Sequence, residues 1–119
     1  MKKENIIVDK SFAFAVRIVK MYQHISETKR EFVLSKQVLR SGTSIGANIQ
    51  EGIQGMSTRD FEHKLSIALK EADETLYWLR LLHATDYLST SEFDSISTDG
   101  KELCKLLTAI LKTSRNNHA

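Results

Sequence analysis

Apolar and small residues recur at steps of three and four along residues 34–52, and this spacing constrains the fold more than any other feature of the chain. Side chains spaced in this way share one face of an α-helix. The positions on this face are Leu34, Val38, Ser41, Ile45, Ile49 and Gly52. Because glycine inside a helix costs about 1 kcal/mol relative to alanine, Gly42 and Gly46 in mid-helix predict a packing or binding role, most simply the close approach of a neighbouring helix.

The same glycines could belong to a phosphate-binding loop, which is the alternative to helix packing. Such loops carry G-x-G-x-x-G after a strand, or G-K-[ST]. Neither motif is present, and residues 36–39 before the glycines have a helical pattern. The sequence therefore favours helix packing over nucleotide binding.

Helical spacing marks four segments, at about residues 9–26, 29–53, 58–85 and 91–115. Asp9 or Ser11 is the candidate N-cap of the first segment, and Ser57 with Asp60 is close to a capping box at the third. Asp99-Gly100 is a candidate interruption of the fourth. The chain has no proline, and its short connections make consecutive helices antiparallel. We therefore expect one all-α domain over residues 1–119, an antiparallel up-down-up-down four-helix bundle.

The first helical segment is apolar on two faces. One face carries Phe12, Ala15, Val16, Val19 and Tyr22, and the other carries Phe14, Ile18, Met21 and Ile25. A helix that packs against a single core needs only one apolar face. The second face therefore predicts contacts beyond that core.

Cysteine content and hydropathy indicate which cellular compartment to expect for the protein. The single Cys104 excludes an intramolecular disulfide, and the polar start of the chain lacks the apolar core of a signal peptide. No apolar run approaches the roughly 18 residues of a membrane span. We expect a cytoplasmic protein with no membrane partner.

Catalytic and metal-binding patterns are weak. Metal sites in bundles use Glu-x-x-His motifs on facing helices, and the nearest match, Asp60-x-x-His63, stands alone. Cys104 sits among apolar positions, and Ser44 has no histidine near it in the sequence. The sequence predicts no enzyme activity, no metal site and no cofactor.

Charge is distributed unevenly along the chain. Residues 1–50 hold nine Lys/Arg and four Asp/Glu, residues 51–100 hold four and ten, and residues 101–119 hold four and one. Basic faces of this kind bind phosphates, although lysines also simply solvate exposed helices. The candidate nucleic-acid contacts are Lys10, Arg17 and Lys20 on the first helix, Lys36 and Arg40 on the second, and Lys101, Lys105 and Lys112 on the fourth. In the expected bundle the first helix lies between the second and fourth, so these residues could form one broad basic surface.

A polar line runs beside the apolar stripe of the second helix. It consists of Arg40, Ser44, Asn48 and Glu51. It could be a hydrogen-bonded seam between helices or subunits, or a ligand contact through Arg40. With the glycines it forms the expected packing and assembly motif, Arg40, Gly42, Ser44, Gly46, Asn48, Glu51 and Gly52.

The run from Ser41 to Gly52, S-G-T-S-I-G-A-N-I-Q-E-G, resembles the signature of bacterial four-helix-bundle proteins encoded by intervening sequences of 23S ribosomal RNA genes. Residues 9–20 and 61–74 are similar to the first and third helices of that family. The resemblance implies a ring-like homo-oligomer, a pentamer. It also implies kinship with the accessory proteins of diversity-generating retroelements, which associate with nucleic acid and a reverse transcriptase. It does not imply a defined activity.

Two functions follow as hypotheses. The first is a non-enzymatic, oligomeric bundle that binds RNA or DNA through its basic helix faces. The alternative is a protein-interaction or assembly scaffold that does not bind nucleic acid.

Overall fold

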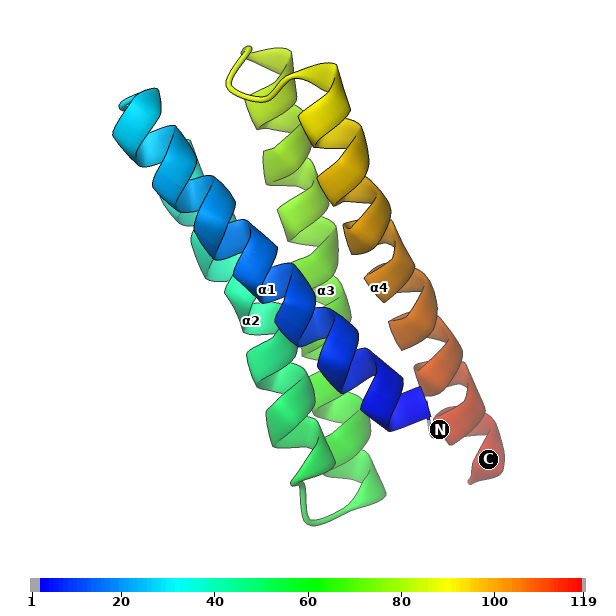
Figure 1. Cartoon of the computed structure of the whole chain (residues 1–119). Coiled ribbons are helices and arrows are strands. Elements are labelled where there is room, and N and C mark those ends of the chain that lie inside the picture. The colour runs from blue at the N-terminus through cyan, green and yellow to red at the C-terminus, as the bar shows by residue number, and fades with distance from the viewer. Residues whose placement is uncertain (1–2, 119) are drawn as a thin grey trace.

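The computed structural model describes the backbone of residues 3–118 and the side chains of residues 6–118. It contains four helices: α1 (Lys3–Thr28), α2 (Leu34–Ile53), α3 (Thr58–Ala84) and α4 (Thr90–Asn117). The helices run alternately up and down along a body of 48 × 22 × 22 Å (Figure 1). Within the described residues, α1 and α3 each contact both α2 and α4, so α1 and α3 lie diagonally opposite. The all-α four-helix fold expected from the sequence is confirmed.

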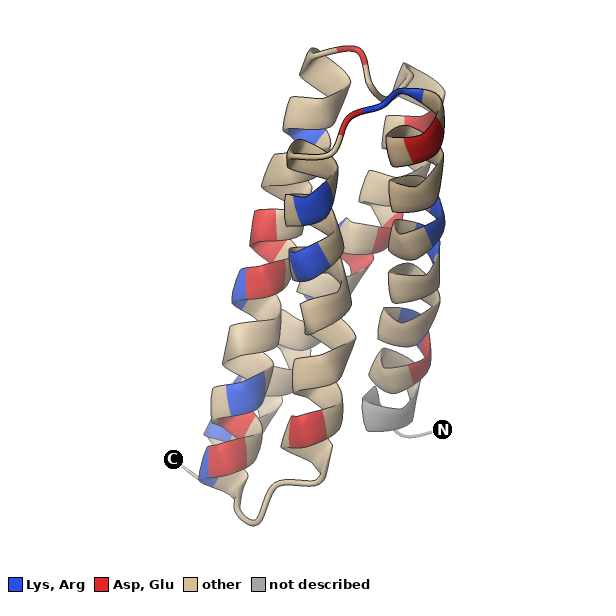
Figure 2. Ribbon diagram, turned by 90° about the vertical axis from the view of Figure 1, so that its left-hand side faces the viewer, with Lys and Arg blue, Asp and Glu red and all other residues tan. Residues whose placement is uncertain are grey.

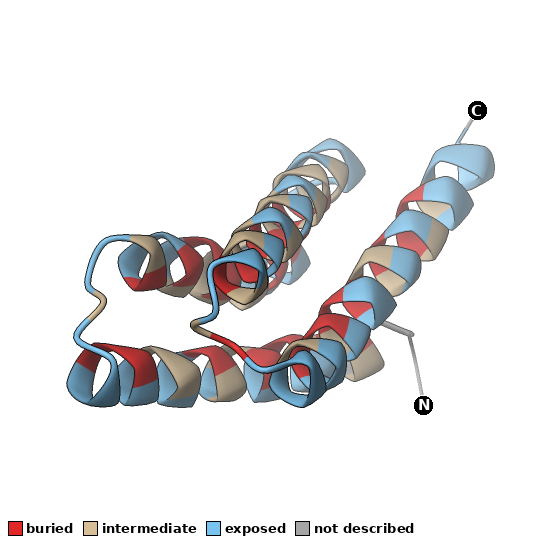
Figure 3. Cartoon of the chain, turned by 90° about the horizontal axis from the view of Figure 1, so that it is seen from above, coloured by how far each residue is buried: buried red, intermediate tan, exposed pale blue. Residues whose placement is uncertain are grey.

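The core runs the length of the bundle and draws on all four helices. Buried positions face the interior and exposed positions face outward (Figure 3). The largest fully buried side chains are Ile7, Phe14, Ile18 and Ile25 of α1, Val38, Ile45 and Ile49 of α2, Leu65, Leu79 and Leu82 of α3, and Leu103 and Leu107 of α4. Phe14, Ile18 and Ile25 belong to one of the two apolar faces expected for the first helix, which is therefore its core face.

Two glycines of α2 stand where a side chain of a neighbouring helix leaves no room for a Cβ atom. A Cβ atom on Gly42 would lie 2.8 Å from Cγ1 of Ile18 in α1, and one on Gly52 would lie 2.8 Å from Cδ1 of Leu65 in α3. Both distances are below any normal carbon–carbon contact. Gly42 and Gly52 therefore allow α2 to pack closely against α1 and α3.

The first helix starts earlier than expected, at Lys3 and not near residue 9. Asp9 and Ser11 lie inside α1, so neither is its N-cap; the Ser11 hydroxyl donates to the carbonyl of Val8 within the same helix (3.1 Å). Ile7 is buried in the core. Burial of this side chain favours a helix that extends toward the N-terminus, beyond the segment that the sequence pattern marks.

The second helix starts later than expected, at Leu34 and not at residue 29. Arg30 has a left-handed backbone (φ 56°), which breaks the helical path after α1. The Glu31 carboxylate then accepts hydrogen bonds from the backbone N–H groups of Val33, Leu34 and Ser35 at 2.8–3.0 Å. These are the donors that a helix start leaves without partners, so Glu31 fixes where α2 begins.

The fourth helix continues through Asp99-Gly100 without the expected interruption. Gly100 is buried against α3, where a Cβ atom would lie 3.0 Å from Cδ2 of Leu76. The glycine thus serves helix packing and not a break. A capping box of Ser89 and Glu92 starts this helix, and the Ser57 side chain accepts from the N–H of Asp60 at the start of α3.

Candidate nucleic-acid interface

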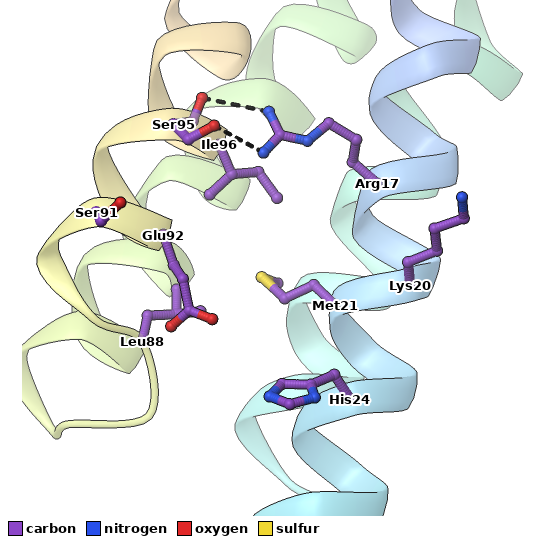
Figure 4. Close-up of a pocket in the computed structure, with 9 residues that line it drawn as sticks. All are labelled: Arg17, Lys20, Met21, His24, Leu88, Ser91, Glu92, Ser95 and Ile96. Atoms are coloured by element: carbon purple, nitrogen blue, oxygen red, sulfur yellow. Dashed lines mark hydrogen bonds between the residues drawn. The ribbon is translucent and has the colours of Figure 1, made fainter.

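The surface between α1 and α4 brings together two of the expected nucleic-acid contacts. Arg17 and Lys20 line a pocket of about 470 Å³, where the two helices diverge toward the end of the bundle that carries the α3–α4 loop (Figures 1 and 4). The other lining residues are Met21 and His24 of α1, Leu88 before α4, and Ser91, Glu92, Ser95 and Ile96 of α4. Sequence reasoning did not single out His24 as a member of this site.

Arg17 is engaged within the chain. Its Nη1 donates to Oδ2 of Asp99 at 2.6 Å. Figure 4 shows its two bonds to Ser95: Nη2 donates to Oγ at 2.9 Å, and Nη1 donates to the backbone carbonyl at 3.3 Å. The side chain is 40% exposed. These bonds tie α1 to α4, so much of the charge expected to attract phosphate is already offset by Asp99.

Lys10 is paired across the same two helices. Its Nζ lies 2.9 Å from Oε1 of Glu102, and both side chains are about half exposed. The hydrogen bond to Glu102, followed by the charge of that carboxylate, raises the pKa of Lys10 above its usual value. Exposed pairs of this kind add little to stability, but this one lowers the net charge of the α1–α4 surface.

Arg40 points to α3 and not toward α1. It forms ion pairs with Glu71, at 3.0 Å, and with Glu74. Glu74 also accepts from Nε1 of Trp78 at 3.2 Å, and this bond, with the Arg40 contact, lowers the pKa of Glu74 below its usual value. Arg40 is therefore separated from the basic residues of α1 and α4.

The rest of the polar line also bonds within the chain. Asn48 donates to the carbonyl of Ser44 at 2.8 Å, and the Ser44 hydroxyl donates to the carbonyl of Arg40 at 2.7 Å. Glu51 pairs with Lys64 of α3 at 2.9 Å. Three ion pairs, two from Arg40 and one from Glu51, therefore link the ends of this line to α3 within the chain.

Five of the expected contacts form no ion pair with any residue whose side chain the structure describes. They are Lys20, Lys36, Lys101, Lys105 and Lys112, all exposed. Lys101, Lys105 and Lys112 are spaced by four and seven residues along α4, opposite the buried Leu103 and Leu107. Figure 2 shows acidic and basic positions interspersed along the helices on one side of the bundle. The broad basic surface expected from the sequence is thus reduced to a lysine stripe on α4, with Lys20 and Lys36 separate from it.

Cys104 is held in a form that disfavours nucleophilic chemistry. Burial, together with the nearby Asp73 carboxylate at 3.5 Å from Sγ, raises the pKa of the thiol to about 12. At neutral pH the thiol stays protonated, and the thiolate is the nucleophile. Among the described side chains, no three His, Cys, Asp or Glu residues gather as metal ligands.

The sequence model of the 23S rRNA-intervening sequence protein family matches residues 3–109, which is most of the chain. The chain belongs to this family. A solved structure from Bacteroides thetaiotaomicron, described as a protein with unknown function from the S23 ribosomal protein family, is 54% identical. The similarity covers 93% of this chain and 99% of that one, with a TM-score of 0.92. No curated protein matches the chain significantly.

Family membership confirms the resemblance carried by residues 41–52. The sequence did not predict Asp99 and Glu102, the two carboxylates that pair with expected nucleic-acid contacts. In this intervening-sequence protein, Asp99 and Glu102 stand three residues apart on α4 and pair with basic residues seven apart on α1. The order is reversed between the two helices, as antiparallel neighbours require, but three residues on α4 face seven on α1. Spacing in the sequence therefore does not indicate this pairing.

In the part of the chain that the structure describes, the four helices lack the apolar length that a membrane span requires.

Proposed function

We propose that this intervening-sequence protein is a non-enzymatic, oligomeric bundle that binds RNA or DNA through phosphate contacts. The observation that carries the proposal is the stripe of Lys101, Lys105 and Lys112 on the outer face of α4, which has no carboxylate partner among the described side chains. A rise of 1.5 Å per residue spreads these ammonium groups over about 16 Å of helix. A linear array of this kind suits a phosphate backbone, and each contact gains free energy from counterion release.

The lysine stripe is a better candidate than the basic residues of α1. Lys10 and Arg17 would have to leave Glu102 and Asp99 before they could bind phosphate. The lysines of the stripe need break no such ion pair. Because the family description refers to 23S rRNA, a structured RNA is the first ligand to test.

A salt series tests this proposal. A fluorescently labelled RNA hairpin is titrated with the protein between 50 and 200 mM NaCl, and affinity is read from anisotropy. We expect the K101E/K105E/K112E variant to bind at least tenfold more weakly at 50 mM salt. Its slope of log affinity against log salt should be shallower by about 2–3, because each lost phosphate contact removes roughly 0.9.

The matched control changes charge by the same amount elsewhere. Lys29 after α1, and Arg59 and Lys70 on α3, are exposed and form no ion pair with a described side chain. The K29E/R59E/K70E variant should keep more of the affinity than the α4 variant. Absence of binding by the wild type at 50 mM salt, or equal losses in the two variants, would overturn the proposed site.

Assembly between copies of the chain is the second candidate function. Phe12, Val16 and Val19 of α1 are 70%, 38% and 37% exposed, and they belong to the second apolar face of that helix. A groove of about 590 Å³ between α1 and α2 is lined by Phe12, Ala15, Thr43 and Gly46, among others. A second copy of the chain would cover this apolar area. The pentamer, and a reverse transcriptase as partner, remain predictions from the family resemblance.

A further inference from the structure

Aromatic side chains gather on the surface where α3 ends and α4 begins, away from the pocket of Figure 4. The His83 ring stacks on the Phe93 ring, with centroids 4.5 Å apart and planes 8° from parallel. Tyr77 is 54% exposed. Together with Arg80 these residues line a pocket of about 350 Å³, completed by Leu81 and Ala84.

The rings of this cluster are held in place by their neighbours. Tyr77 makes an edge-to-face contact with Trp78, with centroids 5.2 Å apart and an angle of 74° between the planes. Trp78 is fixed in turn by its hydrogen bond to Glu74. His83 Nε2 lies 3.2 Å from the Thr90 hydroxyl oxygen. Binding to rings held in this way costs little further loss of side-chain freedom.

Cationic groups border the cluster. Arg80 is exposed and forms no ion pair with a described side chain. Gly100 packs against Leu76, and Cys104 contacts Asp73, so the adjoining Lys101 and Lys105 lie level with the turn of α3 before Tyr77. The lysine stripe of α4 therefore leads toward the aromatic cluster.

Charge alone does not make this surface a binding site. Asp73 and Asp94 stand near the same turns of α3 and α4 and offset part of the charge of Arg80, Lys101 and Lys105. Base–aromatic stacking, in contrast, needs only an accessible ring, and every nucleobase can provide the partner face. An exposed tyrosine, a stacked ring pair and an arginine form the combination that recognises an unpaired base with its phosphate.

We propose that this cluster binds an unpaired nucleobase of single-stranded RNA or DNA. The base stacks on Tyr77 over the pocket, Arg80 binds the adjacent phosphate, and the strand continues onto Lys101 and Lys105. This inference rests on the proposed function and specifies its ligand, a strand with unpaired bases.

The single Trp78 gives the experiment its signal, because it touches Tyr77. The full chain is titrated at 50 mM NaCl with a 12-nucleotide oligoadenylate, an abasic strand of the same length, and a 12-base-pair duplex. We expect the oligoadenylate to change Trp78 fluorescence and to bind more tightly than the abasic strand by about 5- to 150-fold, the equivalent of about 1–3 kcal/mol for one stacked base. The duplex should leave the fluorescence of Trp78 unchanged.

Variants of Tyr77 separate stacking from other contacts, with affinity measured by anisotropy of the labelled oligoadenylate. Y77A should lose the preference over the abasic strand, Y77L should lose it as well, and Y77F should retain it because the ring is kept. F32A removes a 43% exposed aromatic ring from the connection between α1 and α2 and should retain it too.

Each contrary result has a distinct meaning. Equal affinity of the wild type for oligoadenylate and the abasic strand would overturn the stacking site and leave phosphate binding intact. Full binding by Y77L would indicate contact through apolar area, as with a protein partner, and would also overturn it. Absence of binding to all three nucleic acids would overturn the proposed function together with this inference.

Discussion

Gly42 illustrates how one residue sets the distance between two helices. A methyl group there would meet Cγ1 and Cγ2 of Ile18 at 2.8 and 2.9 Å. Isoleucine is stiff at χ1 and this one is fully buried, so it cannot easily move aside. Gly46, one turn later, is less confined, because its nearest neighbour would be the Ser11 hydroxyl at 3.4 Å.

These two glycines should respond differently to alanine. At Gly42 the overpacking cost of about 1–3 kcal/mol should outweigh the gain of about 1 kcal/mol in helix propensity. We expect G42A to lower the free energy of unfolding by up to about 2 kcal/mol. G46A is the matched control and should be neutral or slightly stabilising. Urea denaturation of both variants checks this, and equal stability of G42A and G46A would contradict it.

Ser41 shows that the spacing of residues along one helix does not identify the hydrogen-bond partner of a buried side chain. The sequence places it on the apolar stripe of the second helix. In the structure the Ser41 hydroxyl lies 2.8 Å from that of Thr75, and both residues are fully buried between α2 and α3. A buried hydroxyl needs a hydrogen-bond partner, and the partner here comes from another helix, which spacing along α2 cannot identify.

At the scale of the helix, the start of α2 depends on one carboxylate. Glu31 accepts from three backbone N–H groups at the first turn. Desolvation acts to raise its pKa, but these donors lower it below the usual value overall. Because the folded-state pKa lies below the unfolded one, the stabilisation is complete above the unfolded pKa and is lost as the pH falls through the folded pKa.

We therefore expect E31Q to reduce stability at pH 7 by about 0.5–2 kcal/mol, the usual range for loss of a helix cap. The difference from the wild type should begin to shrink as the pH falls below the unfolded pKa of about 4.3, and it should vanish below the lowered folded pKa, where Glu31 is also uncharged. Denaturation at several pH values measures it. The control is E27Q at an exposed residue of α1 that forms no ion pair with a described side chain. A difference that does not change between pH 7 and pH 3 would contradict this account.

The start of α1 shows why the ends of helices are difficult to predict from sequence. Ile6, Ile7 and Val8 are β-branched and have modest helix propensity. The structure nevertheless has them in a helix, with Ile7 buried in the core. Tertiary packing thus overrides a local preference at this end.

Across the whole molecule, much of the charge is balanced between neighbouring helices. Ion pairs join α1 to α4 through Lys10 and Arg17, and α2 to α3 through Arg40 and Glu51. The uneven distribution of charge along the sequence is therefore less pronounced on the surface of the folded protein. Of the expected nucleic-acid contacts, the lysine stripe, Lys20 and Lys36 form no ion pair with a described side chain.

Assembly is a property of the whole molecule and can be tested there. Light scattering of the wild type should give a mass above the 13.6 kDa of one chain. F12E should shift the distribution toward the monomer, because a carboxylate on that face would have to be desolvated in the interface. V33E is the control, since Val33 is equally exposed but lies just before α2, away from that face. A wild type of 13.6 kDa, or an F12E variant that keeps its size, would contradict assembly through α1.

The sequence by itself determined the fold class, the antiparallel order of four helices and the core face of the second, because helical periodicity and short connections are local properties of the chain. It left two apolar faces for the first helix, and the structure decided which of them faces the core. It also carried the family likeness in residues 41–52. Only the tertiary structure decided which basic residues stay available. Whether Lys10, Arg17 and Arg40 meet water or a carboxylate depends on side chains more than 30 residues away. The aromatic cluster at the α3–α4 junction arises in the same way, because Tyr77 and Phe93 become neighbours only when the two helices pack together.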